Sequence, residues 1–439
     1  MKSVETVLAL VALSTVVAAF ANRLAIPAPS LLVAAGLVAG LLPGVPDVRV
    51  PPTVVSLVVL PPLLYASGEE LSVRDLRTVW RPVAVLSVGL VLVSALAVAL
   101  VAGALTPLAP APAFVLGAIL ASTDPVAVTA LGRRLSLPPR MQTLVQAESL
   151  FNDATSLLLF KVALSVAVAG SAVGAGHIGL EFLRLGGGGL LTGAAVAGAA
   201  RLIRRRVEDP LVDTVISLVT PYAAYVLGEA LGTSGVTAVV VAAVILGTQV
   251  TKVTNAHTRI QRHAVYETLI FLLESTIFGL IGLQLPTLVR DLAPSGRSWV
   301  VPVLAITAAL LATRCLGVFP LSAAAQVRAE TWRRGESRLS WRVPAVISWS
   351  GTRGVVPLAA ALSIPLTAHG GAALTARPLL LVLVSGVVVI TLLVQGFSLA
   401  PMVRWAGVAV PPQSLQQEHA HARLRIAAAG LARSGRARS

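Results

Sequence analysis

The chain contains a single cysteine, Cys315, among its 439 residues. One thiol excludes an internal disulfide framework and any metal site built from several cysteines. Charged residues are also scarce, at 12% of the chain, whereas hydrophobic residues make up 56%. A soluble protein could not bury that much apolar surface, so the sequence predicts an all-α polytopic protein that lies mostly in lipid.

Apolar segments follow one another along nearly the whole chain, and they predict thirteen membrane-spanning helices. The first of them lacks a clear small-residue cleavage site and runs into the second, so we interpret it as a span and not as a signal peptide. The predicted spans are 4–21, 24–42, 53–67, 80–105, 112–131, 142–170, 179–203, 211–231, 233–251, 262–287, 299–326, 343–366 and 376–402.

Lysine and arginine are distributed unevenly between the two sets of loops that these spans define. One set, together with the tail 407–439, holds 25 of the 34 basic residues, and the opposite set holds five. Because basic residues collect in cytoplasmic loops, we expect a plasma (inner) membrane protein with its amino terminus outside and its carboxyl terminus in the cytoplasm. The net charge of +15 therefore indicates topology and no nucleic-acid partner. The Arg-rich tail is expected to lie near anionic lipid.

A few charged residues fall inside the predicted spans, where a charge costs several kcal/mol unless it is paired or hydrated. Asp153 and Arg353 each lie about 15 Å into their spans, near the middle of the bilayer core, which predicts one shared, hydrated site. The interior carboxylates are Asp124, Glu148, Asp153, Glu229, Glu267 and Glu274, and the interior cations are Lys161, Arg184, Arg314 and Arg353.

The segment from Glu148 to Asp153 has helical periodicity. Glu148 and Asn152 are four residues apart and share one face of a helix, as do Ser149 and Asp153 on a second face about 100° away. One face can line an ion pathway while the other contacts neighbouring helices. The alternative interpretation is a structural polar cluster that cross-links the helices.

Two predicted spans are interrupted beside polar residues. Pro125 follows Asp124 and frees the carbonyl of Ala121, and Gly351 to Pro357 surround Arg353. Interrupted spans in each half of the chain are typical of the discontinuous helices of an inverted repeat, with a binding site between them. Asp124 can neutralise the amino-terminal end of a half-helix and Arg353 a carboxyl-terminal end, which leaves Thr123 to coordinate a cation.

These and other polar segments resemble the signature of the monovalent cation/proton antiporters, in the branch of sodium/proton exchangers that includes the bacterial NhaP-type proteins. The resemblance covers most of residues 5–405, and its segments occur in the family's order. They are Ser122–Val128, Glu148–Ala154, Tyr225–Leu231 with Ser234–Val236, Phe278–Leu285, Thr313–Val318 and Gly351–Pro357.

The resemblance implies a membrane antiporter domain over residues 1–406, built as two inverted six-helix repeats. It implies a core at about 80–170 and 299–402, a dimerisation scaffold at about 4–67 and 211–287, and a linker helix at about 179–203. A homodimer is therefore expected.

The resemblance also implies roles for individual residues. Asp153 is the shuttling carboxylate, Arg314 is the partner of Glu148, and Arg353 is a structural charge. The expected cation site comprises Asp153, Glu148, Ser149, Thr123, Asp124 and Asn152. Asn152 stands where the electrogenic branch of the family has a second aspartate, so we expect electroneutral exchange of one Na⁺ for one H⁺ with no cofactor.

Other cations and other classes of protein are alternatives to this interpretation. Potassium is the main rival to sodium, since the same oxygen ligands serve both ions, and Li⁺ is a further candidate. A cation channel is disfavoured because nothing resembles a selectivity filter. Gly232 to Gly235 match the four-residue pattern of rhomboid-type proteases, but no span supplies a histidine to activate Ser234. The sequence therefore predicts a transporter and not an enzyme.

Overall fold

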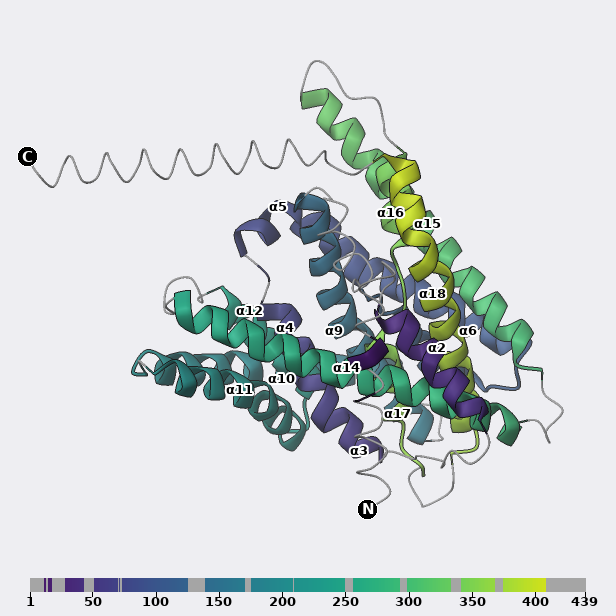
Figure 1. Cartoon of the computed structure of the whole chain (residues 1–439), viewed down its shortest axis with the longest axis horizontal. Helices are drawn as coiled ribbons and strands as arrows, with labels where there is room; N and C mark the ends of the chain where they lie inside the picture. Colours follow the sequence, from purple (N-terminus) through teal and green to yellow (C-terminus); the bar gives the residue numbers. More distant parts are fainter. Residues whose placement is uncertain are drawn as a thin grey trace, which may run out of the picture.

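A computed structural model describes most of the chain, and every named element within the described residues is a helix (Figure 1). The extended backbone there forms an isolated bridge between Asp124 and Thr352. The described residues are 12, 15–17, 28–42, 51–69, 71, 73–124, 139–169, 175–207, 209–248, 256–292, 298–332, 341–367 and 374–407.

The helices overlap the predicted spans from 24–42 to 376–402, whereas span 4–21 lies almost entirely outside the described residues. In chain order they are α2 (Ala28–Leu41), α3 (Pro52–Val54), η1 (Val55–Val59), α4 (Leu60–Glu69), α5 (Val73–Ala84), η2 (Val85–Leu90), α6 (Val91–Leu105), α7 (Pro110–Ala121), α9 (Pro139–Ala169), α10 (Ala175–Arg204), α11 (Pro210–Ala230), α12 (Gly235–Gly247), α14 (Ala256–Leu292), α15 (Val300–Trp332), α16 (Arg342–Trp349), α17 (Val355–Leu362) and α18 (Arg377–Ala406).

Seven helical stretches in the described chain are long and apolar enough to cross a bilayer. A further three apolar helices, α2, α7 and α12, are shorter. The long stretches are Val79–Leu105, Gln142–Val168, Gly176–Arg204, Pro210–Ala230, Thr258–Arg290, Val300–Ala323 and Arg377–Ala406. The protein is therefore an all-helical membrane protein, as the sequence predicted.

Proline shapes the helix that begins at residue 52. Pro61 and Pro62 have no N–H group, so the carbonyls of Leu57 and Val58 lose their usual partners four residues on. The wider π-helical turn η1 ends two residues before the first of these prolines. The carbonyl of Val58 instead accepts a hydrogen bond from the Tyr222 hydroxyl of α11, at 3.4 Å.

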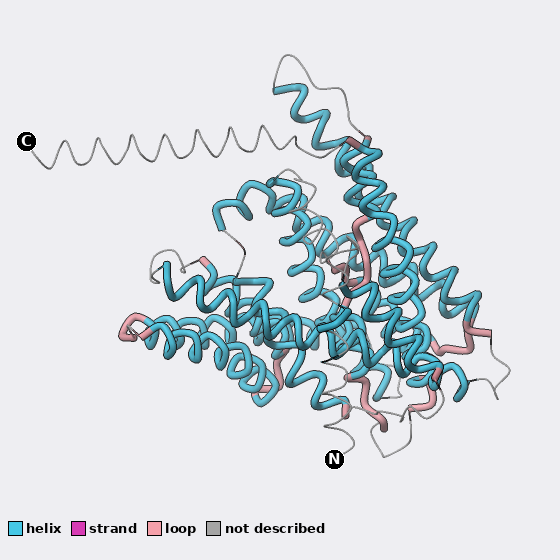
Figure 2. The backbone as a smooth tube through the Cα atoms, in the orientation of Figure 1, coloured by secondary structure: helices cyan, strands magenta, loops and turns pink. Residues whose placement is uncertain are grey.

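The helices gather in two groups with α9 and α14 between them. Figure 1 shows α10, α11 and α12 on one side and α6, α15, α16 and α18 on the other, and the tube in Figure 2 follows the same arrangement. Within the groups α12 packs on α10 and α4, and α6 packs on α7 and α15. Helix α14 packs on α2 and also reaches α17 and α18, so it contacts both groups.

A buried ion cluster joins the ends of four helices. Arg204 of α10 contacts Asp213 of α11 at 2.6 Å, and Arg262 of α14 contacts Asp213 at 3.3 Å and Glu69 of α4 at 3.2 Å. The sequence interpretation counted both arginines among the loop cations, yet the structure buries them. Such charges remain inside only when they are paired, so the cluster fastens these helix ends together.

Two of the carboxylates that were expected in the interior are not buried. The side chain of Glu267 is 56% exposed and contacts His263 one turn away, and that of Glu229 is 41% exposed. Both residues lie within stretches long enough to cross a bilayer, as predicted, and the structure adds that their side chains are exposed. Hydropathy shows that a residue belongs to a span, but it does not show which way the side chain points from the helix.

Candidate functional site

The candidate site lies where two interrupted helical segments cross. Helix α7 ends at Ala121, and the extended residues that follow meet the gap between α16 and α17. There the N–H of Asp124 donates to the carbonyl of Thr352 at 2.8 Å, and the Thr352 hydroxyl donates to the carbonyl of Asp124 at 2.9 Å. Pro125 lies outside the described residues.

Fixed charges lie against the helix ends at this crossing. The Arg353 guanidinium donates to the carbonyl of Ala121, at 2.9 Å, and also to the carbonyl of Ser122, both at the carboxyl-terminal end of α7. The Asp124 carboxylate lies so close to Gly354, directly before α17, that a Cβ atom there would overlap it. Each charge opposes the partial charge of the helix end that it faces.

Helix α9 contacts the extended stretch through both of its polar faces. The Ser149 hydroxyl donates to the carbonyl of Thr123 at 2.8 Å, and the Asn152 amide donates to the Thr123 hydroxyl at 2.5 Å. The N–H of Thr123 donates to Asn152 Oδ1 at 3.3 Å. The Ser122 hydroxyl donates to Asp153 Oδ1. The structure therefore brings Thr123, Ser149, Asn152 and Asp153 together.

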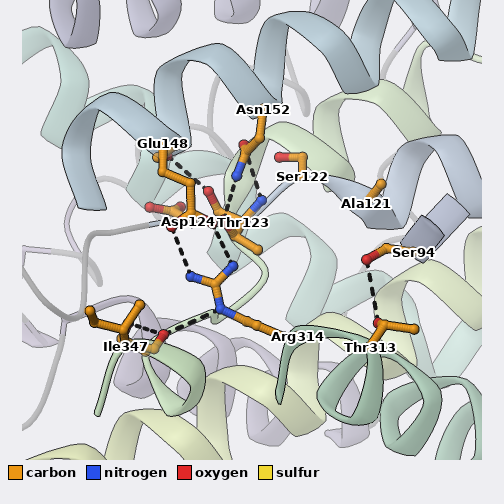
Figure 3. Close-up of polar contacts among 12 residues, drawn as sticks. Ser94, Ala121, Ser122, Thr123, Asp124, Glu148, Asn152, Thr313, Arg314 and Ile347 are labelled. Carbon is orange, nitrogen blue, oxygen red and sulfur yellow. Dashed lines mark hydrogen bonds and ion pairs between the residues drawn. The ribbon is translucent and has the colours of Figure 1, made fainter. Parts of the chain in front are cut away.

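Glu148 forms a bidentate, buried ion pair with Arg314 of α15 (Figure 3). Arg314 Nη1 and Nη2 donate to its two carboxylate oxygens at 2.7 and 3.2 Å, and Arg314 Nε donates to the carbonyl of Ile347 in α16 at 3.3 Å. A side chain at Gly351 would collide with this guanidinium. Since both oxygens of Glu148 are engaged, only their second lone pairs remain for the cation-ligand role that the sequence predicted.

Among the described contacts of the site, the Asp153 carboxylate takes part in no ion pair. The three carboxylates of Asp124, Glu148 and Asp153 face the two guanidiniums of Arg314 and Arg353. Glu148 is held by Arg314 and Asp124 lies at a helix end, whereas the hydrogen bond that the Asp153 carboxylate accepts comes from a neutral hydroxyl. A buried carboxylate in this position favours one bound positive charge, either a proton or a monovalent cation. The Ser149 hydroxyl and the Thr123 carbonyl add the oxygen donors that hard cations prefer.

Sequence reasoning missed three contributors to the site. Ser122 and Thr352 were quoted within motifs but were given no role, although one donates to Asp153 and the other pairs with Asp124. Glu274 was noted only as an interior carboxylate. It lies in α14, close enough to Asp124 for the two carboxylates to repel each other. The available sequence signal was a carboxylate within the long apolar stretch Thr258–Arg290.

Comparison with known proteins agrees with this architecture. The family model for the transmembrane sodium/hydrogen exchangers matches residues 9–405, so the chain belongs to that family. An uncharacterized Na⁺/H⁺ exchanger of Mycobacterium tuberculosis is 36% identical over 405 residues, which are 91% of this chain and 74% of the relative. A sodium, potassium, lithium and rubidium/H⁺ antiporter of Bacillus pumilus is 29% identical over 403 residues, covering 89% of this chain and 59% of that protein.

The fold is also similar to that of a solved structure. The sodium proton antiporter MjNhaP1 from Methanocaldococcus jannaschii aligns with a TM-score of 0.71 at 18% identity. The alignment covers 92% of this chain and 98% of MjNhaP1. The expected resemblance to NhaP-type exchangers is therefore confirmed, and at this identity the structural match shows the fold alone.

The Glu148–Arg314 pair yields a prediction about stability. Removing one partner of a buried ion pair typically costs about 3–5 kcal/mol, because the other charge is left without compensation. Glu148→Gln and Arg314→Ala should each lower the melting temperature in detergent and also lower ion exchange per folded protein. An unchanged melting temperature for both variants would contradict the pairing.

Asp213→Asn supplies the matched control, since it breaks a buried pair remote from the crossing. This variant should also melt at a lower temperature, yet its exchange per folded protein should stay near that of the parent. A parallel loss of exchange in all three variants would mean that the assay reports stability alone.

Proposed function

We propose that the protein exchanges Na⁺ for H⁺ across the membrane by alternating access, with Asp153 as the shuttling carboxylate. The observation that carries this proposal is the buried Asp153 carboxylate, which accepts a hydrogen bond from the neutral hydroxyl of Ser122. The Ser149 hydroxyl, one turn away on α9, and the Thr123 carbonyl to which it donates are further oxygen ligands. One proton or one sodium ion would neutralise the Asp153 carboxylate, so the two ions compete for a single place. Membership of the sodium/hydrogen exchanger family supports the assignment.

The finer architecture belongs to the same proposal. We propose thirteen spans in two inverted repeats, with the amino terminus outside and the carboxyl terminus in the cytoplasm of the plasma membrane. The core and scaffold are those expected from the sequence, at about 80–170 with 299–402 and at about 4–67 with 211–287. The grouping of α10, α11 and α12 apart from α6, α15 and α16 supports such a division.

Potassium is the second candidate for the exchanged cation. The Bacillus pumilus relative is described as an antiporter of sodium, potassium, lithium and rubidium. Carbonyl, hydroxyl and carboxylate oxygens can hold any of these ions. Adding Na⁺, Li⁺ and K⁺ in turn to purified protein in liposomes with a pH-sensitive dye would rank the ions. Proton movement with K⁺ alone would replace sodium in the proposal.

Asp153→Asn should abolish cation-driven proton movement, because an amide neither carries a negative charge nor releases a proton. The variant should remain folded, with a melting temperature close to that of the parent. Asparagine has nearly the same size as aspartate, and its amide oxygen can still accept the hydrogen bond from Ser122. Dye quenching in proteoliposomes measures the exchange. Glu267→Gln changes an exposed carboxylate and should exchange normally. Normal exchange by Asp153→Asn would end the proposal.

We propose further that the exchange is electroneutral, with one cation for one proton. Glu148 is tied to an arginine that stays protonated at any relevant pH, and Asn152 cannot titrate. Asp153 then carries either one proton or one monovalent cation, and both loaded states have the same net charge. The membrane potential, worth about 2.3 kcal/mol per charge per 100 mV, has no net charge to act on.

An imposed membrane potential should therefore leave the sodium-driven proton flux unchanged. Potassium with valinomycin sets the potential in proteoliposomes, and a solid-supported membrane reports any transport current under saturating sodium. If K⁺ is itself a substrate, the potassium gradient would drive exchange directly, and the current on the solid-supported membrane is then the measurement to use. A flux that follows the potential would reveal a second titrating group. Glu274, close to Asp124, is the first to test, by repeating the measurement on Glu274→Gln.

We also propose that the protein is a homodimer whose interface is formed by the scaffold. The ground is the family resemblance. Chemical cross-linking and native mass spectrometry in mild detergent should both report a mass of two chains. The same experiments repeated in several detergents and lipids control for dissociation. Monomers under all of these conditions would refute the dimer.

A further inference from the structure

A second ion pair joins the helix that carries Asp153 to the other group of helices. Lys161 lies eight residues beyond Asp153 on α9, about 12 Å further along the helix axis at 1.5 Å per residue. Its ammonium group contacts Glu229 Oε1, in the last turn of α11. Helix α11 falls in the proposed scaffold and α9 in the proposed core. This pair therefore connects the two proposed bodies.

The α11 side of the contact is arranged to receive an ammonium group. The ring of Tyr225, one turn before Glu229, has its centroid 5.7 Å from Lys161 Nζ, within the range of a cation–π interaction. The same Glu229 Oε1 accepts the N–H of Gly235, the first residue of α12, at 2.9 Å. The carboxylate is thus held by the start of α12 whether or not Lys161 is present.

The exposure of this pair distinguishes it from the pair inside the site. The side chains of Lys161 and Glu229 are 21% and 41% exposed, whereas those of Arg314 and Glu148 are 4% and 1% exposed. Partly exposed ion pairs contribute less to stability than fully buried pairs, which are costly to break. The Lys161–Glu229 contact can therefore open and close readily, whereas the Glu148–Arg314 contact is suited to holding helices permanently together.

We propose that Lys161 and Glu229 form a releasable latch between α9 and α11 that must open during each exchange cycle. The inference rests on the proposed alternating access around Asp153. In the conformation described here the latch is closed, and it holds the carboxyl-terminal half of α9 against the scaffold. With the proposed orientation this half faces the outside, so the closed latch bars the outer approach to the site.

A reversible cross-link tests the latch directly. Lys161→Cys and Glu229→Cys are combined in a Cys315→Ala background, so that the introduced thiols are the sole cysteines of the chain. A short bis-methanethiosulfonate reagent should link them in folded protein. Exchange in proteoliposomes should then fall about tenfold or more, because the closing and opening motion gates transport, and a reducing agent should restore it. Each single-cysteine variant, treated with the same reagent, should keep exchanging.

Two outcomes would overturn the latch. They are exchange at the unlinked rate by the cross-linked protein, and failure of the two cysteines to link in protein that elutes as a folded species. Absence of exchange in the wild-type protein would instead count against the proposed function.

Lys161→Arg and Lys161→Gln provide a second, independent comparison. Arginine keeps the positive charge and the contact with Tyr225, so its apparent KM for sodium should match the wild type. Glutamine removes the charge, which favours the open latch and should shift this KM severalfold while the protein still turns over. Equal KM values for the two variants would refute the latch even if the cysteine pair failed to fold.

Discussion

The candidate site depends on satisfying the backbone of two interrupted helices inside a membrane. Within the hydrocarbon region an unpaired N–H or C=O group costs several kcal/mol, so a helix can break there only where other groups replace its hydrogen bonds. Arg353 supplies donors to the carbonyls that end α7, and the Asp124–Thr352 bridge satisfies the extended residues between the helix ends. Because the fixed charges hold this crossing in place, the carbonyl of Thr123 is left facing Ser149.

Three carboxylates of similar intrinsic chemistry acquire different characters from their surroundings. Glu148 is neutralised by Arg314 across a bidentate contact, and Asp124 faces the start of α17. The described contact of Asp153 is with the hydroxyl of Ser122, which orients the carboxylate without supplying a charge. Arg353 also acts electrostatically on Asp153, but its guanidinium donates to the carbonyls of Ala121 and Ser122.

The sequence predicted the features of this site that are local in the chain. Prolines and glycines located the interruption of the helix around Arg353, and the four-residue spacing placed Ser149 and Asp153 on one face of α9. Contacts between distant segments were not predictable in this way. Ser122 as the donor to Asp153, and the burial of Arg204 and Arg262, depend on how far each helix is rotated about its own axis. Hydropathy does not fix that rotation, which is also why the exposure of the Glu229 and Glu267 side chains was not predictable.

The distribution of strong and weak polar contacts also constrains how the protein can move. Glu148 and Arg314 join α9 to α15, Arg314 joins both to α16, and Ser149 and Asn152 join α9 to the end of α7. All of these contacts are buried, so separating any of these helices would expose several unpaired polar groups together, at about 1–3 kcal/mol for each neutral group and more for a charge. Helices α7, α9, α15 and α16 are therefore expected to move as one unit that keeps the ion site intact. At the boundary between α9 and α11 the described ion pair, Lys161 with Glu229, is more exposed than the Glu148–Arg314 pair. The proposed motion of α9 against α11 would therefore break a less buried contact than any motion that divided α9 from α7 or α15.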